Sequence, residues 1–278
     1  MKNRKVPVAL ILLIGSAVCI SFSGCKERTY RLLLPSSKEE LSTFHRALEA
    51  PGTETEASVF MDTKAPRERT VRYHGNDVHG TYNFSYKNYR NDTVIDRYWV
   101  DRGAKGSPVQ FYVRKTDGKL LYIEFDTASE TEAFPLISED EALEKARIEA
   151  SEWISINESR ETRVMLSEEG KPESGYVYRF FRTHEGIDTT EFVEVAITEQ
   201  GTLWYLSSPD PGWTERKGSE LRAFSMEKAE QAVKEGFPHP IYRIVPARFG
   251  LNEKDRVYLE YSVFTSNDTV MTVFVILE

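Results

Sequence analysis

The stretch RTHEGIDTTEF, residues 182–192, contains the most suggestive chemical motif of the sequence. His184, Glu185 and Asp188 follow the order of the zinc motif H-E-x-x-H, with Asp in the place of the second His. In that motif two ligands four residues apart share one face of a helix, and the Glu acts as a general base. The residues therefore leave two interpretations, a metal site and a polar turn.

The surroundings of the motif favour the turn. Gly186 lies at its centre, and residues 176–180 and 193–197 on its two sides alternate in apolar character. That period of two is typical of β-strands, and glycine between two strands is typical of a hairpin connection. We therefore predict a β-hairpin without a metal at His184. Either Asp188 or Thr189 can hydrogen-bond the backbone of the turn.

The sequence HGNDVH, residues 74–79, is the second cluster of side chains that bind metals. In a strand, Asp77 and His79 share a face, and His74 would have to fold back onto them. Gly, Asn and Asp are turn residues, so a polar hairpin turn is the simpler interpretation. The sequence has no G-x-S-x-G motif, the signature of a serine nucleophile. With 44 acidic residues, the sequence alone does not indicate which two would form a catalytic carboxylate pair. The sequence thus predicts no catalytic residue, no metal ligand and no cofactor.

Trp204, Tyr205 and Trp213 form an aromatic group beside the sequence SSPDPGW. Such side chains form either a binding patch or part of a sheet packed against a helix. We expect the second, so the sequence assigns no residues to a binding surface.

The first 25 residues predict where the protein resides. MKNRK is basic, the next 18 residues are apolar, and Phe22-Ser23-Gly24-Cys25 resembles a bacterial lipobox with Phe in the place of the usual Leu. This order is that of a secretory signal, and a lipobox implies acylation of Cys25, with palmitate for example. We expect a signal peptide over 1–24, a tether over 25–35, and a location on the extracytoplasmic face of the cell membrane. The alternatives are an ordinary signal peptide and an uncleaved membrane anchor.

Composition restricts how the protein is stabilised and what it binds. With 40% hydrophobic and 29% charged residues the chain is globular. Cys19 lies inside the signal, so the mature chain has one cysteine and no disulfide or Cys-based metal site. Removal of Lys2, Arg4 and Lys5 leaves 33 basic against 44 acidic residues, a net charge of −11. Anionic membranes repel such a protein, so the lipid at Cys25 must anchor it, and no basic stripe suggests nucleic acid.

Three helices and many strands are predicted. Period-two patterns predict antiparallel hairpins, and TVMTVFVIL, residues 269–277, predicts a central strand near the C-terminus. The helices begin at capping boxes or a Ser N-cap, and glycine and proline end the last one. These signals are Ser37 with Glu40, Ser138 with Glu141, and Ser225 with Gly236 and Pro238.

Recurring markers divide the chain into three parts. We predict an α+β fold of three tandem units, each with one helix packed on an antiparallel sheet, over 36–128, 137–213 and 222–278. The last unit ends before its G-x-L-x-Y strand, so we expect its sheet to be one strand short, with an edge that can pair with something else. Chance similarity of short β-rich segments is the alternative. The markers are G-x-L-x-Y at 118–122 and 201–205, the caps Ser138 and Ser225, and Asp-Thr at 92–93, 188–189 and 268–269.

The span YRFFRTHEGIDTTEFVEVAITEQGTLWYL resembles the repeat of YcdB/YcdC-type proteins, relatives of the PepSY domain. The resemblance is best over 137–207. Asp188 stands where Pro often follows Gly-Ile, and the outer two units lack the Gly-Ile pair. The resemblance implies PepSY-like units that restrain proteases or bind other proteins, with no catalytic residue set. The matching residues are Arg182, Gly186, Ile187, Val195, Gly201 and Tyr205.

These observations lead to one expected function and two alternatives. We expect a non-enzymatic, lipid-anchored envelope protein that binds a protein or peptide, with strand addition at a free sheet edge as the binding mode and protease inhibition as one role. The first alternative is an envelope hydrolase or metal-dependent enzyme, built from residues 74–79 or from the acidic residues. The second is a structural envelope lipoprotein with no specific ligand.

Overall fold

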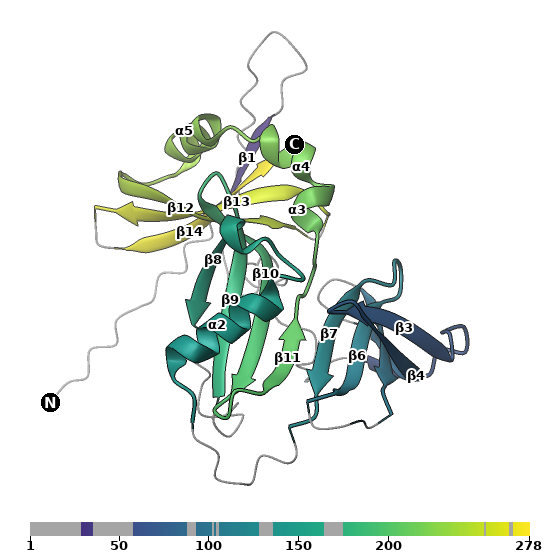
Figure 1. Ribbon diagram of the computed structural model, residues 1–278. Helices are drawn as coiled ribbons and strands as arrows, with labels where there is room; N and C mark the ends of the chain where they lie inside the picture. The colour runs from purple at the N-terminus through teal and green to yellow at the C-terminus, as the bar shows by residue number, and fades with distance from the viewer. Residues whose placement is uncertain are drawn as a thin grey trace, which may run out of the picture.

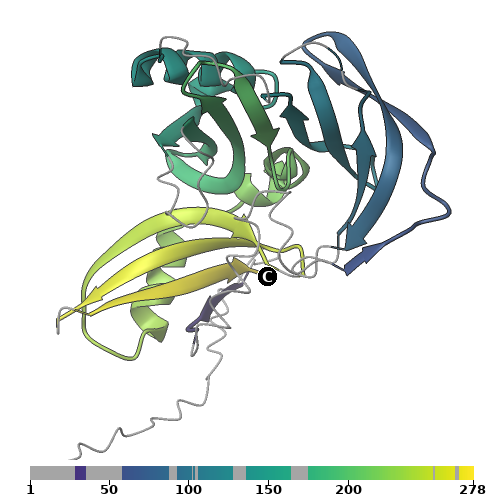
Figure 2. The same cartoon turned by 90° about the horizontal axis from the view of Figure 1, so that it is seen from below.

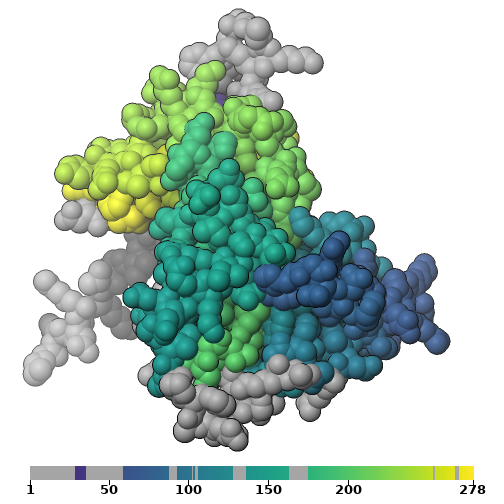
Figure 3. Space-filling model, viewed as in Figure 1, coloured from purple at the N-terminus to yellow at the C-terminus, as the bar shows by residue number. Residues whose placement is uncertain are grey.

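The computed structural model describes most of the chain after the predicted signal peptide, and its strands form one 14-stranded, hydrogen-bonded sheet. In Figure 1 the strands of residues 58–125, a middle group and a C-terminal group follow one another across the molecule, and Figure 3 shows that the three groups adjoin. The signal peptide, Cys25 and the helix predicted from Ser37 lie outside the described residues. These are 29–35, 58–87, 93–101, 103, 106–127, 136–163, 175–252, 254–266 and 269–278.

Strands outnumber helices throughout the described residues. The N-terminal strands are β1 (Tyr30–Leu33), β2 (Ser58–Phe60), β3 (Glu68–Tyr73), β4 (Asn76–Lys87), β5 (Val94–Trp99), β6 (Pro108–Arg114) and β7 (Leu120–Phe125). The middle elements are α2 (Glu139–Ala150), the 3₁₀ turn η2 (Ile156–Glu158), β8 (Ser159–Arg163), β9 (Gly175–His184), β10 (Ile187–Thr198) and β11 (Leu203–Ser207). The C-terminal elements are α3 (Trp213–Arg216), α4 (Gly218–Arg222), α5 (Met226–Gly236), β12 (Ile241–Leu251), β13 (Val257–Thr265) and β14 (Val270–Leu277).

The predicted fold of three tandem helix-on-sheet units is wrong. The main path of the sheet runs β1-β14-β13-β12-β10-β11-β7-β6-β5-β4-β2, so strands of all three expected units share one sheet. Two pairings join the units: β11 with β7, and a short parallel contact of β10 with β12 at Asp188–Arg248 and Thr189–Phe249. The physical reason is that an unpaired strand edge leaves backbone N–H and C=O groups unsatisfied, and pairing between units satisfies them.

The edge of the last unit, which lacks a strand of its own, is occupied by β1. Residues 30–33, predicted as part of a tether, pair antiparallel with β14 from Tyr30–Leu277 to Leu33–Phe274. A distant segment therefore completes this sheet. The final strand β14 is central, as its apolar sequence predicted, with β13 on one side and β1 on the other.

Helix α2 begins where the sequence predicted. The side chain of Ser138 accepts a hydrogen bond from the Glu141 amide at 3.2 Å, and the Glu141 carboxylate accepts one from the Ser138 amide at 2.8 Å. This is the capping box. The buried face of α2 consists of Ala142, Ala146 and Ala150, whose small side chains allow the helix to lie close to β9 and β10.

Helix α5 covers a second core. Its N-cap Ser225 accepts from the Lys228 amide, and the helix ends at Gly236, as predicted. Ala229 and Val233 pack among side chains of β12, β13 and β14, whereas the core beneath α2 consists of β3–β7 and β9–β11. Figure 2 shows α2 and the strands β12–β14 on opposite sides of the middle strands. The two largest apolar clusters of the described residues thus lie along one sheet.

Candidate functional site

The motif at residues 184–188 forms a two-residue hairpin turn. Glu185 and Gly186 have φ angles of 50° and 77°, and His184 pairs with Ile187 across the turn. Positive φ at both central residues defines a type I′ turn, the connection that matches the twist of two strands. The predicted β-hairpin is confirmed.

The three polar side chains of this motif have different surroundings. The ring of His184 lies 5.5 Å from that of Phe249, and Glu185 is exposed. Asp188 accepts from Arg160 of β8, with 2.8 Å between Nε and Oδ1. Asp188 is thus an ion-pair partner of β8, whereas the hydroxyl of Thr189 accepts a hydrogen bond from the backbone amide of Glu191, further along β10, at 3.1 Å. The side chains do not converge on one point.

We expect His184→Ala to leave bound metal unchanged. The free energy of unfolding should fall by at most about 1.5 kcal/mol, the upper value for an aromatic pair, because the ring of His184 packs on Phe249. Elemental analysis and denaturant unfolding of both proteins measure the two quantities. Loss of a stoichiometric metal from the variant would contradict the interpretation of this stretch as a turn.

The cluster at residues 74–79 is likewise a hairpin. His74 and Gly75 form the turn between β3 and β4, with φ angles of 46° and 74°. His74 Nε2 lies 2.7 Å from Glu149 of α2, whereas His79 Nδ1 lies 2.7 Å from Thr70 of β3. The two histidines therefore have separate partners. Across the described residues, no group of three or more His, Cys, Asp or Glu side chains is arranged to hold a metal ion.

The aromatic group of Trp204, Tyr205 and Trp213 is divided between two environments. Trp213 is buried in the core beneath α5. Tyr205 lies in β11, where its hydroxyl donates to Glu194 at 2.9 Å. The β10–β11 register shifts at Trp204, and the ring of Trp204 lies 5.3 Å from that of Tyr205. The three side chains do not form one patch.

One face of strands β5–β7 and β9–β11 carries hydrogen-bonded polar and aromatic side chains, which we call the polar row. At one end of the row, Glu194 of β10 accepts from Arg179 Nε at 2.6 Å and from the Tyr205 hydroxyl. Burial, reinforced by Glu194, raises the pKa of Tyr205 above its ordinary value. The phenol therefore stays protonated and acts as a hydrogen-bond donor to the carboxylate.

The other end of the polar row repeats this arrangement with different residues. Glu124 of β7 accepts from the Tyr122 hydroxyl at 3.1 Å and from Gln110, which in turn accepts from Arg97. Burial and the charge of Glu124 raise the pKa of Tyr122. Because both phenols have raised pKa values and donate to carboxylates, neither is suited to exchange protons near neutral pH. The polar row holds strands together.

Sequence reasoning missed a cross-strand contact that recurs in three hairpins. In each, an arginine Nε on the first strand donates to a carboxylate or amide on the second, across a partly buried sheet face. The signal that reveals it is an Arg in one strand and Glu or Gln in the next. The pairs are Arg97–Gln110 at 2.6 Å, Arg179–Glu194 at 2.6 Å and Arg248–Glu260 at 2.7 Å.

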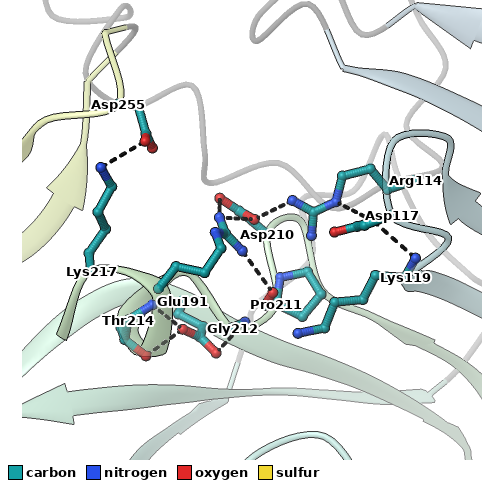
Figure 4. A network of polar contacts seen from close by, with 11 residues as sticks. Arg114, Asp117, Lys119, Glu191, Asp210, Pro211, Gly212, Thr214, Lys217 and Asp255 are labelled. Carbon is teal, nitrogen blue, oxygen red and sulfur yellow. Dashed lines mark hydrogen bonds and ion pairs between the residues drawn. The ribbon is translucent and has the colours of Figure 1, made fainter.

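A buried carboxylate joins the middle strands to the C-terminal helices. Glu191 lies where the β9–β10 register shifts, is 3% exposed, and accepts from the Gly212 amide at 2.8 Å and the Thr214 amide at 2.9 Å. It also accepts from the Thr214 hydroxyl at 2.6 Å. Figure 4 shows Glu191 beside these two residues, at the first turn of α3. The carboxylate thus caps a helix from a different element.

Ion pairs surround this capped turn and link all three groups of strands. Asp210 accepts from Arg114, at the end of β6, with 2.9 Å between Nη1 and Oδ1 (Figure 4). Lys217 lies 2.7 Å from Asp255 in the β12–β13 turn. We call residues 208–217 the junction, because they contact β6, β10 and the C-terminal sheet. The junction is a structural joint of the molecule.

The edge strands differ in how well they prevent pairing with other chains. β3 and β8 carry charged residues, and the free part of β12 contains Pro246 and register shifts on both sides of it. Charges, proline and bulges are the usual features that protect an edge. β2 has none of these: Val59, Phe60 and the following Met61 are 58%, 39% and 69% exposed. Among the described edge strands, which include β1 with its charged Arg31 at the other end of the path, β2 alone carries no charge, proline or bulge.

The fold and these surfaces define a strand-rich protein, built on one large mixed sheet, that presents an apolar sheet edge. No helix among the described residues has the length and apolar character needed to cross a membrane. Comparison of the chain with protein-family models, curated proteins and solved structures gives no match. The similarity to YcdB/YcdC-type repeats stays a prediction from the sequence motifs of residues 137–207.

Proposed function

We propose that this chain is a lipid-anchored protein of a bacterial cell envelope that binds an extended segment of another polypeptide at the edge of β2. Two groups of observations support the proposal. The leader ending in Cys25 supports secretion and lipid attachment. The exposed edge strand supports peptide binding, and it is the observation on which the binding function rests.

An unpaired strand edge selects its partner by chemistry. One side of β2 pairs with β4 from Ser58–Lys87 to Phe60–Ser85, and β2 ends the strand path. Backbone N–H and C=O groups on the other side of an edge strand are complemented best by another backbone, which adds as a further strand. Alternating side chains of the guest would contact Val59 on one face and Phe60 on the other.

The edge is held in position by its neighbours. Directly after Met61, the Asp62 amide donates to the Tyr82 hydroxyl at 2.9 Å, and the Asp62 carboxylate pairs with Lys115. These contacts tie the connection after β2 to β4 and to the β6–β7 turn. A preformed edge binds a partner with less ordering cost than a mobile one.

The proposal predicts cross-linking at Val59. With a photo-cross-linking residue at Val59 of the full chain in its native envelope, we expect an adduct of discrete mass. The matched control is the same residue at Val270, which is similarly exposed at 54% in a different strand. Adding Phe60→Lys should reduce the adduct about tenfold, because a charged edge opposes strand addition. The same yield of adduct at Val59 and at Val270, or a yield at Val59 that Phe60→Lys leaves unchanged, would contradict the proposal.

A further inference from the structure

The chain from Thr29, four residues after Cys25, is built into the folded domain. The carbonyl of Thr29 accepts from the Glu278 amide at 2.9 Å, and β1 then pairs with β14 over four residues. The Tyr30 hydroxyl accepts from the Ser225 amide at 2.6 Å, and its ring meets that of Phe224 at 5.3 Å. Tyr30 belongs to the core beneath α5. Thr29 and Tyr30 therefore have a definite place in the domain.

This placement leaves a very short connection to a lipid on Cys25. Three residues, Lys26 to Arg28, separate Cys25 from Thr29. Four Cα–Cα steps span at most about 14 Å, even when the chain is fully extended. A lipid-linked Cys25 lies at the membrane surface, so Thr29 lies within that distance of it. A freely rotating domain needs a much longer connection.

The β12–β13 turn lies at the same end of the domain as Thr29. Arg256 donates to the carbonyl of Leu277 at 2.9 Å, next to the Glu278 that contacts Thr29. In Figure 1 the marked C-terminus and β1 lie together at the top, whereas α2 lies over the lower half. The start of β1, the C-terminus and this turn thus form one surface, which we call the β1 end.

Charge distinguishes the β1 end from the rest of the C-terminal region. Residues 128–278 carry 16 basic and 29 acidic side chains, a net charge of −13. Among the described residues near Thr29 the balance reverses, with six basic and four acidic side chains in residues 29–31, 217–228, 252, 254–256 and 278. An anionic membrane repels the first distribution and weakly attracts the second. The charge of the β1 end and the short connection to Cys25 therefore both favour a β1 end that faces the membrane.

We propose that the lipid-anchored protein holds its β1 end against the membrane, with α2 and the lower ends of β9–β11 directed away from it. The inference rests on the proposed lipid anchor and specifies the surface that faces the bilayer. The partner of this surface is an anionic phospholipid bilayer.

Fluorescence quenching tests the orientation. The acylated sulfur of Cys25 is no longer a free thiol, so Lys254→Cys and Asp140→Cys each add the one reactive thiol of the mature chain. Both side chains are exposed, Lys254 at the β1 end and Asp140 in the first turn of α2. The lipidated full-length mature protein, labelled at either position, is placed in vesicles containing anionic phospholipid and a nitroxide-headgroup lipid. We expect quenching at 254 to exceed quenching at 140 by about threefold or more, given the short connection.

A second variant makes the result independent of the label. Inserting about twenty Gly and Ser residues after Arg28 gives a flexible connection with a root-mean-square length of about 25 Å, which should remove most of the difference. Equal quenching at both positions with the native connection would overturn the orientation alone. Protein missing from the vesicle fraction would overturn the lipid anchor, and the orientation with it.

Discussion

Replacing Cys25 with Ala is expected to abolish acylation and stable membrane attachment. Each buried methylene of an acyl chain contributes about 0.8 kcal/mol to membrane binding, so losing the lipid removes most of the binding free energy. The remaining mature chain has a net charge of −11 and gains little from an anionic surface. The variant should be released, or retained through its uncleaved leader alone.

Radiolabelled palmitate and the mass of the chain separate these outcomes. The wild type should incorporate label and lack residues 1–24, and Cys25→Ala should incorporate none. Cys19→Ala is the matched control, because it removes a cysteine from the apolar part of the leader and leaves the lipobox intact. Full acylation of Cys25→Ala would refute the lipid attachment site, and loss of acylation in Cys19→Ala would show that the effect is not specific to Cys25.

Glu191→Ala is expected to destabilise the fold by about 3–5 kcal/mol, the cost of removing one partner from a buried, charge-assisted network. The substitution leaves the amides of Gly212 and Thr214 without their acceptor at the start of α3. It also removes the buried carboxylate 3.5 Å from Arg182 Nε. Because α3 leads into the junction, the loss should weaken the contact between the middle strands and the C-terminal sheet.

Two companion variants separate the roles of charge and position. Glu191→Gln keeps one acceptor oxygen and should lose about 1.5–3 kcal/mol, the value of a hydrogen bond to a charged group. Glu185→Asn, on the same hairpin, should change stability by at most about 0.5 kcal/mol, because Glu185 is exposed with a positive φ that Asn tolerates. Denaturant unfolding of the chain without its leader measures all three. A loss below about 1 kcal/mol for Glu191→Ala would contradict the role assigned to this carboxylate.

Local features of this protein were predictable, and long-range pairings were not. The turn at Glu185–Gly186 and the capping box of Ser138 depend on neighbours within a few residues, so short sequence patterns were enough to predict them. The pairing of β10 with β12 joins residues 60 positions apart in sequence, from Asp188 to Arg248. No periodic pattern specifies which of several apolar strands becomes the neighbour of another.

The polar contacts show the same division. The sequence placed Asp188 in the right hairpin, but its partner Arg160 comes from β8, a strand with little apolar pattern. In the sequence, nothing distinguished Glu191 from the other 43 acidic residues. Its role depends on the start of α3, which lies 21 residues further along the chain. A buried carboxylate is recognisable only when its amide partners are in place.

The sequence by itself determined the caps of α2 and α5 and the hairpin turns, because each depends on residues close together in the chain, and it is the basis of the proposed leader and of the proposed lipid on Cys25. Only the tertiary structure decided that β1 completes the C-terminal sheet, that β2 is left as the unprotected edge, and that Glu191 caps α3. These outcomes follow from the requirement that every buried strand edge and polar group find a partner, and the partners come from distant parts of the chain.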